Sequence, residues 1–145
     1  MIRAVLDTNV LVSAMLSHLG PPARIYHAWR DGERELVSSY SLIEELDVVL
    51  RRPTMRENHG MTNAQIADLI TLITENATMT PGTIEVEVVK EDPDDNKFLA
   101  CAAEADAEYI VSGDKHLLTL GHYGDVAIVR PRVFADLLDE ERRDK

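Results

Sequence analysis

Short runs of aliphatic residues alternate along this chain with longer segments in which apolar residues recur every three or four positions. The short runs end in small polar residues, which is typical of strands buried on both faces of a sheet. The predicted strands are residues 4–6, 36–39, 109–111 and 126–129, and the predicted helices are residues 10–17, 21–30, 41–52, 62–76, 95–106 and 131–138. Because helices separate the strands, we predict an α/β fold, a three-layer α/β/α sandwich with a central parallel sheet.

Other stretches are less regular. Residues 55–60 are predicted to form an exposed loop, and residues 117–120 a short helix or turn. Residues 77–89 are expected to form one strand, or two pieces broken by Pro81 and Gly82, because apolar residues alternate at positions 84, 86 and 88. Ser41 is the expected cap of the helix that follows it. The inward residues of the last helix are expected to be Val133, Phe134, Leu137 and Leu138, and the charged tail after them is expected to be solvated.

The composition fits one globular domain over residues 1–145, with 45% hydrophobic and 28% charged residues. The N-terminus has no signal-peptide pattern, and the single cysteine, Cys101, is expected in the core. These features predict a cytoplasmic protein without disulfides or a membrane span. A net charge of −11 disfavours broad electrostatic attraction to nucleic acid. It does not exclude a nuclease, because acids around a metal are neutralised by the bound cation.

Two aspartates follow predicted strands directly. Asp7 ends the run AVL, and Asp114 follows the run YIV after Ser112 and Gly113. In parallel sheets, ligand sites lie beyond the carboxyl ends of the strands. If the two strands are neighbours, both carboxylates lie at one edge of the sheet.

Helical spacing selects one acid in each of two helices. Asp95 shares the inward face with Phe98, Leu99 and Ala102, whereas Asp94 and Asn96 fall to either side as capping or surface residues. An inward acid is unfavourable unless it is paired, hydrogen-bonded or bound to metal.

The same count separates two glutamates of the helix at 41–52. Glu45 borders the inward stripe of Leu42, Leu46 and Val49, whereas Glu44 lies on the opposite face. The convergent set is therefore Asp7, Glu45, Asp95 and Asp114. Taken alone, each acid is better explained as a helix cap or turn residue. Four acids converging from separate segments are harder to explain in that way, and together they would repel one another in a cleft. Mg²⁺ or Mn²⁺, which prefer carboxylate and water ligands, would relieve this repulsion. The histidines show no zinc spacing, and His116 alone lies near the set.

These segments resemble the PIN-domain family of metal-dependent ribonucleases, particularly the VapC-like toxins of type II toxin–antitoxin systems. The matching segments, in family order, are residues 7–11 (DTNVL), 45–46 (EL), 92–100 (DPDDNKFLA) and 111–115 (VSGDK). The resemblance implies the same α/β/α fold, and it implies that Asp7, Glu45, Asp95 and Asp114 bind metal and act in catalysis. Thr8, Asn9 and Ser112 match supporting polar positions, where many relatives have threonine in place of Ser112. Asp92 is an extra acid whose role the resemblance leaves open.

The activity implied by the resemblance is hydrolysis of RNA phosphodiester bonds assisted by one or two Mg²⁺ or Mn²⁺ ions, with water attacking the phosphorus in line. Either Glu45 or Asp95 would orient or deprotonate that water. Basic residues proposed to hold the RNA backbone are Arg51, Arg52, Arg56, Lys97 and Lys115, each of which also reads as ordinary surface charge. The expected partners are an RNA substrate, a cognate antitoxin and a second copy of the chain in a homodimer.

Two other readings stay open. A phosphotransfer enzyme of another doubly wound fold would need a second aspartate two residues after Asp7, where this chain has Asn9, or an early pair of adjacent acids before Lys115. The other reading is a non-catalytic binding module held by a partner, which the acidic surface permits and the intact acid set disfavours.

Overall fold

The computed structural model describes residues 2–143, so Met1 and the last two residues of the predicted solvated tail lie outside the described part. The elements, in chain order, are β1 (Arg3–Leu6), α1 (Thr8–Leu16), α2 (Pro21–Arg30), β2 (Glu35–Ser39), α3 (Tyr40–Leu50), α4 (Pro53–His59), α5 (Asn63–Asn76), β3 (Thr78–Thr80), the 3₁₀ turn η1 (Pro93–Asp95), α6 (Asn96–Glu104), β4 (Tyr109–Val111), α7 (Lys115–Leu120), β5 (His122–Tyr123), β6 (Val126–Val129) and α8 (Pro131–Arg143). The predicted α/β class is confirmed.

The strands form one six-stranded sheet in the order β3-β2-β1-β4-β6-β5. All neighbouring pairs are parallel except β5 and β6, which form an antiparallel hairpin that the sequence analysis did not predict. From β1 the chain adds β2 and β3 on one side of the sheet and then β4 and β6 on the other, so the order of connections reverses between β1 and β4. In open α/β sheets this reversal is where the crevice for a ligand forms.

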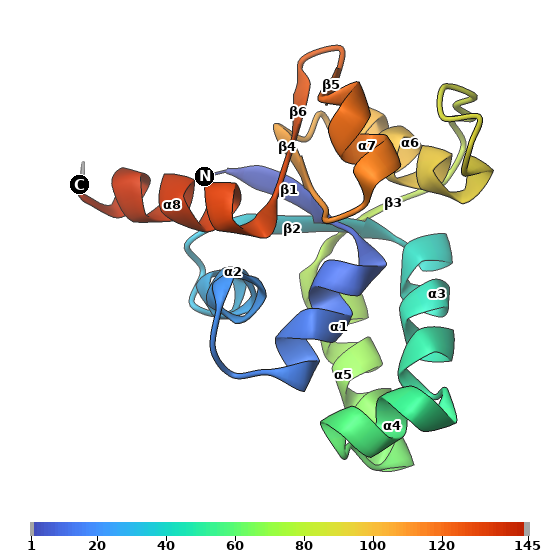
Figure 1. Ribbon diagram of the computed structural model, residues 1–145, viewed down its shortest axis with the longest axis vertical. Coiled ribbons are helices and arrows are strands. Elements are labelled where there is room, and N and C mark those ends of the chain that lie inside the picture. Colours follow the sequence, from blue (N-terminus) through green and yellow to red (C-terminus); the bar gives the residue numbers. More distant parts are fainter. Residues whose placement is uncertain (1, 144–145) are drawn as a thin grey trace.

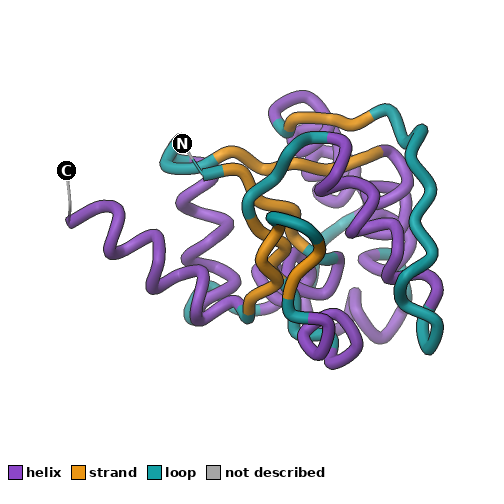
Figure 2. The backbone as a smooth tube through the Cα atoms, turned by 90° about the horizontal axis from the view of Figure 1, so that it is seen from above, coloured by secondary structure: helices purple, strands orange, loops and turns teal. Residues whose placement is uncertain are grey.

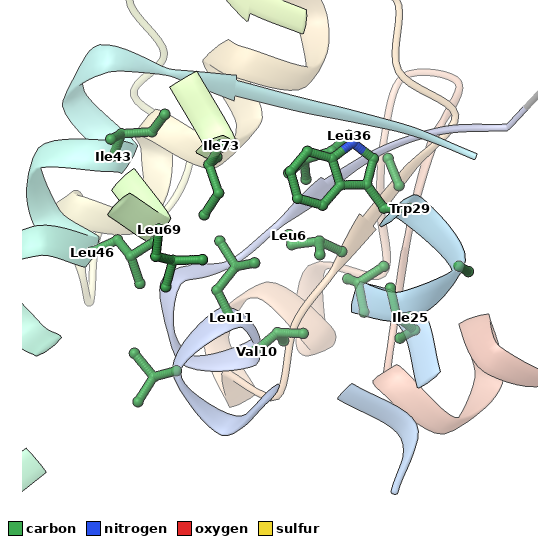
Figure 3. Close-up of a cluster of buried hydrophobic side chains, with 14 of the residues drawn as sticks. Leu6, Val10, Leu11, Ile25, Trp29, Leu36, Ile43, Leu46, Leu69 and Ile73 are labelled. Atoms are coloured by element: carbon green, nitrogen blue, oxygen red, sulfur yellow. The ribbon is translucent and has the colours of Figure 1, made fainter. Parts of the chain in front are cut away.

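Helices cover both faces of the sheet (Figure 1). One face carries α1, α2, α3, α5 and α8, and the larger apolar core lies beneath them. Figure 3 shows part of this core, in which Leu6 and Leu36 of the sheet meet Leu11, Trp29 and Ile73 of the helices. The other face carries α6 and α7 over a smaller core that contains Val5, Phe98 and the predicted buried residue Cys101. Alternate residues of β1 thus point into different cores, as expected for a strand buried on both faces.

The cap of helix α3 lies two residues earlier than predicted. Its cap is Ser39, whose hydroxyl accepts the Leu42 N–H at 3.3 Å, so the predicted cap Ser41 is wrong and Ser41 lies within the helix. The Thr62 cap of α5 is a complete capping box, with reciprocal bonds to Gln65 of 3.1 and 2.8 Å.

The predicted loop at residues 55–60 is wrong, because Pro53–His59 form helix α4. This helix has no buried residue and therefore no apolar stripe by which to recognise it. The sequence signals that indicate this helix lie at its two ends. Pro53 stands at the first helical position, and Gly60 ends the helix with a left-handed φ of 68°. His59 then fastens the helix to α3 through a 2.8 Å bond to the Leu50 carbonyl.

The predicted strand around residues 84–88 is also wrong. β3 ends at Thr80, and residues 81–91 form no helix or strand but a long segment, the teal stretch at the right of Figure 2. Side chains of α6 satisfy its backbone in place of a strand partner. Asn96 Oδ1 accepts the Val88 and Val89 N–H groups at 3.0 and 2.8 Å, and Glu104 accepts the Thr83 N–H at 3.3 Å. Of the alternating apolar residues, only Val86 packs against the smaller core, whereas Ile84 and Val88 are exposed.

The last helix packs on α2 through Phe134, Ala135 and Leu138, which are buried. Val133 was predicted to face inward, but its side chain is exposed because it lies off this stripe. Among the helices of residues 2–143, none combines the length and the apolar character that a membrane span requires.

Arg34, directly before β2, is a buried cation without a carboxylate partner in the described residues. It is 1% exposed, and its Nε and Nη2 both donate to the Ile25 carbonyl, at 3.2 and 2.8 Å. Its Nη1 has no hydrogen-bond partner, and its guanidinium lies 5.8 Å from the centre of the Phe134 ring. Burial lowers the pKa of Arg34 to about 9.

Candidate metal centre

The candidate site lies where β1 and β4 end. These strands are parallel neighbours, with Leu6 opposite Val111, and the polar residues that follow each strand meet at one edge of the sheet. Asp7 follows β1, and Ser112 to Asp114 follow β4. Since the order of strand connections reverses between β1 and β4, this edge is the expected crevice of the fold.

Asp7 is held by a network of short hydrogen bonds. It caps α1, where its Oδ1 accepts the Asn9 N–H at 2.6 Å. Its Oδ2 accepts the Ser112 hydroxyl at 2.5 Å, and the same hydroxyl oxygen accepts the Asp114 N–H at 2.9 Å. Asp7 and Ser112 are both buried. Burial nevertheless raises the pKa of Asp7, because desolvation outweighs the hydrogen bonds that favour its charged form.

Three other aspartates converge beside it. Asp114 caps α7 by accepting the His116 N–H at 3.0 Å, while Asp92 directly precedes the 3₁₀ turn η1 and Asp95 is the last residue of that turn. One carboxylate oxygen from each of Asp92, Asp95 and Asp114 lies within 4.8 Å of those of the other two. Residues three apart eclipse in a 3₁₀ turn, which explains why Asp92 and Asp95 face the same way.

The acids line a cavity of about 160 Å³. Its described lining residues are Asp7, Thr8, Asn9, Glu45, Asp92, Asp94, Asp95, Phe98 and Asp114. Glu45 lies on the α3 side and forms an ion pair with Lys97 of α6, both side chains being partly exposed. The cavity is therefore lined by a cluster of aspartates and by one member of an ion pair.

Asp95 has the most altered acidity of the group. Burial raises the pKa of Asp95 to about 8, and hydrogen bonding and charge repulsion from Asp114 add to this effect. The pKa of Asp114 is lowered, chiefly because Asp95 donates a hydrogen bond to it. At neutral pH, without a cation, Asp95 thus keeps its proton and shares it with Asp114. Its other oxygen, Oδ2, is buried and has no hydrogen-bond partner.

These groups fit a divalent cation. A buried carboxylate oxygen without a partner is costly, and Asp95 also belongs to a group of carboxylates that repel one another. A cation would satisfy that oxygen and relieve the repulsion. The described residues that line the cavity include no histidine or cysteine, so the donors are oxygens, which suit Mg²⁺ or Mn²⁺ better than zinc.

All four acids of the predicted set line this one cavity, although they come from four separate segments. The structure differs from the prediction in which of the acids lie closest together. Asp92, which the sequence analysis treated as an extra acid, belongs to the cluster of three, while Asp7 and Glu45 lie outside it. Asp94 was assigned to the surface. It is exposed and also borders the cavity. The sequence sign of a 3₁₀ turn was the three-residue spacing of Asp92 and Asp95, with a proline directly after Asp92.

The supporting residues and the proposed RNA contacts lie at different distances from the cavity. Thr8 and Asn9 line it, and Ser112 acts through Asp7. Lys97 is linked to the cavity by its ion pair with Glu45. Lys115 and His116 directly follow Asp114, in the first turn of α7. The described lining does not include Arg51 or Arg52, and Arg51 is paired with Asp47 at 2.8 Å.

Comparison with known proteins gives two matches. A family model described as a PIN domain matches residues 3–116, a span that contains every described acid of the cavity. An uncharacterised protein of Methanocaldococcus jannaschii is 31% identical over 119 residues, which are 82% of this chain and 75% of that protein.

Proposed function

The chain belongs to the PIN-domain family, and on that basis we propose that it is a metal-dependent endoribonuclease that hydrolyses RNA phosphodiester bonds. PIN domains are generally nucleases. The observation that carries the proposal for this chain is the grouping of Asp92, Asp95 and Asp114 at the ends of β1 and β4. A cluster of carboxylates with one unsatisfied buried oxygen suits a divalent ion, and a phosphodiester is a substrate that such an ion activates.

In this proposal Asp92, Asp95 and Asp114 hold Mg²⁺ or Mn²⁺, and Asp7 completes the set from across the cavity. The bound ion would neutralise the phosphate charge, stabilise the leaving oxygen and lower the pKa of water. The Ser112 hydroxyl bonds to both the Asp7 carboxylate and the Asp114 backbone N–H, so it fixes the position of one residue relative to the other. Because Asp95 keeps its proton at neutral pH in the metal-free protein, that proton must leave before the carboxylate binds a cation.

Glu45 is the acid of the cavity best placed to act on water. It lies outside the group of three aspartates and is not held by a helix cap, unlike Asp7 and Asp114. Its partner Lys97 balances its charge at the cavity side. We assign to Glu45 the orientation and deprotonation of the attacking water, with Asp95 serving as a ligand.

We further propose that the protein is the toxin of a toxin–antitoxin pair and forms a homodimer. The toxin role extends the sequence resemblance, and a small antitoxin gene beside its own would support it. The dimer proposal draws on Leu16 and Leu19 near the end of α1, whose side chains are 38% and 84% exposed. Sedimentation of wild type and Leu19→Lys protein tests it: a dimer that Leu19→Lys converts to monomer supports the proposal, and a monomeric wild type contradicts it.

The nuclease proposal is tested by substrate choice and metal dependence. Purified protein is incubated with labelled single-stranded RNA or with DNA of the same sequence, in Mn²⁺, Mg²⁺ or excess chelator. We expect internal cleavage of RNA in either metal, and none in chelator. Cleavage of DNA alone would contradict the RNA assignment. Failure to cleave RNA, structured RNA and DNA in both metals would favour a non-catalytic binding module.

A further inference from the structure

A second cavity, of about 310 Å³, lies beside the acid-lined cavity at the same edge of the sheet. It lies beyond β2 and β3, whose last residues Ser39 and Thr80 are register partners and both line it. The acid-lined cavity lies beyond β1 and β4, and β1 is the neighbour of β2. The two cavities are therefore adjacent along the carboxyl ends of four consecutive strands.

Helices α3 and α6 border both cavities. Ser41 lines the second cavity, and Glu45, four residues or about 6 Å further along α3, lines the first. On α6, Lys97, Ala100 and Glu104 follow the helical repeat along the second cavity. Because Lys97 also pairs with Glu45, this ion pair forms the boundary between the two spaces.

The lining of the second cavity is unsuited to a phosphate but suited to an uncharged polar ring. Residues 82–87 cover it with the apolar side chains of Ile84 and Val86 and with two carboxylates, Glu85 and Glu87. Glu104 adds a third carboxylate, and Lys97 is the one cation among the described lining residues. Carboxylates repel phosphate and accept hydrogen bonds from N–H and O–H groups. A nucleobase and ribose offer such donors together with an apolar face.

We propose that this cavity binds the nucleoside of the nucleotide next to the scissile phosphate. The inference rests on the proposed nuclease function, which places the phosphate in the acid-lined cavity. Lys97, at the boundary, contacts the phosphate that joins the two positions. A volume of about 310 Å³ is at the small end of ligand sites, which suits one nucleoside. A base inserted here cannot be stacked in a duplex, so the RNA must be unpaired at this position.

Nucleoside binding to the metal-free protein tests the site without any need for catalysis. Adenosine, guanosine, cytidine and uridine are titrated to millimolar concentration while backbone amide resonances are followed by NMR. At least one of them should shift the resonances of Ser41, Val86 and Ala100. Ser41→Trp, a substitution of an exposed residue that fills the cavity, should weaken this binding by about tenfold or more.

Val48→Trp is the matched control. Val48 lies on the same helix, is 54% exposed and is not among the described residues of either cavity, so this variant should bind nucleosides like wild type. The amide spectrum of each variant checks that its fold is retained. If none of the four nucleosides shifts these resonances, or if Ser41→Trp binds like wild type, the site is overturned.

Kinetics separate this site from the metal centre. Ser41→Trp should lower kcat/KM for RNA by about tenfold and leave unchanged both Mn²⁺ affinity and the hydrolysis of bis(4-nitrophenyl) phosphate, which carries no nucleoside. If wild type cleaves RNA and Ser41→Trp cleaves it equally well, the nucleoside site is wrong although the nuclease proposal stands. If wild type cleaves no RNA, the nuclease proposal fails, and the placement of the nucleoside beside a scissile phosphate fails with it.

Discussion

The Ser112 hydroxyl donates a 2.5 Å hydrogen bond to Asp7 Oδ2, which joins residues that are 105 positions apart in the chain. The same hydroxyl oxygen accepts the Asp114 N–H at 2.9 Å. One buried side chain thus sets the position of acids that follow two different strands. Partners of this kind orient metal ligands without touching the metal.

Replacing Ser112 by alanine should weaken the metal site. We expect Ser112→Ala to lower Mn²⁺ affinity by about 10- to 100-fold, because Asp7 loses the donor that orients it. Titration calorimetry measures the affinity. Ser112→Thr, which keeps the hydroxyl, should bind metal closer to wild type. Equal Mn²⁺ affinity in the alanine variant would show that Ser112 does not position the site.

Replacing Asp95 by asparagine should stabilise the metal-free protein. The folded protein raises the pKa of Asp95 from 3.8 to about 8, so it binds a proton there that the unfolded chain releases. Stability from this group is therefore full at low pH and is lost as pH rises from about 4 to about 8. An asparagine carries no charge and escapes that loss. Chemical denaturation in chelator should show an advantage of Asp95→Asn over wild type that grows with pH.

Asp94→Asn is the matched control, since it makes the same substitution at the adjacent, exposed position. Its effect on stability should be small and should vary little with pH. Mn²⁺ should raise the melting temperature of wild type and of Asp94→Asn but not of Asp95→Asn. An Asp95→Asn protein whose stability parallels that of wild type from pH 4 to 8 would contradict a proton held between Asp95 and Asp114.

Metal affinity should itself depend on pH. Below pH 8 the proton on Asp95 competes with the cation, so affinity should rise as pH increases toward about 8 and then level off. Each ion bound near neutral pH should release up to about one proton. Calorimetry of Mn²⁺ binding in buffers with different ionisation enthalpies measures this release. Binding that is independent of pH between 6 and 8 would mean that Asp95 is already ionised.

The buried guanidinium of Arg34 should contribute little net stability. It makes two bonds to one carbonyl oxygen and leaves Nη1 unsatisfied, so its desolvation is poorly compensated. Arg34→Met keeps an unbranched apolar stem and should match or exceed wild-type stability, whereas Arg34→Ala leaves a larger cavity and should lose about 2–4 kcal/mol. Urea denaturation measures both. A methionine variant as unstable as the alanine variant would show that the bonds to Ile25 outweigh the cost of burial.

The parts of the site that depend on local sequence were predictable. The aspartates at positions 7 and 114 end aliphatic runs, and the inward positions of Asp95 and Glu45 follow from helical spacing. The remainder depends on contacts between distant segments. The 84–88 alternation indicated a strand, but Asn96 supplies its hydrogen bonds from α6. The grouping of Asp92 with Asp95 depends on a 3₁₀ turn that the helical count did not distinguish from the helix beyond it.

The most direct test of the proposed function compares RNA cleavage by wild type, Asp114→Asn and Asp106→Asn proteins in Mn²⁺. Asp114 lies in the carboxylate cluster, whereas Asp106 is exposed and not among the described residues of the acid-lined cavity, so the two variants lose the same charge at different places. We expect wild type and Asp106→Asn to cleave RNA at similar rates, and Asp114→Asn to be slower by about 100-fold or more. Cleavage by Asp114→Asn at the wild-type rate would contradict a nuclease centre at these carboxylates.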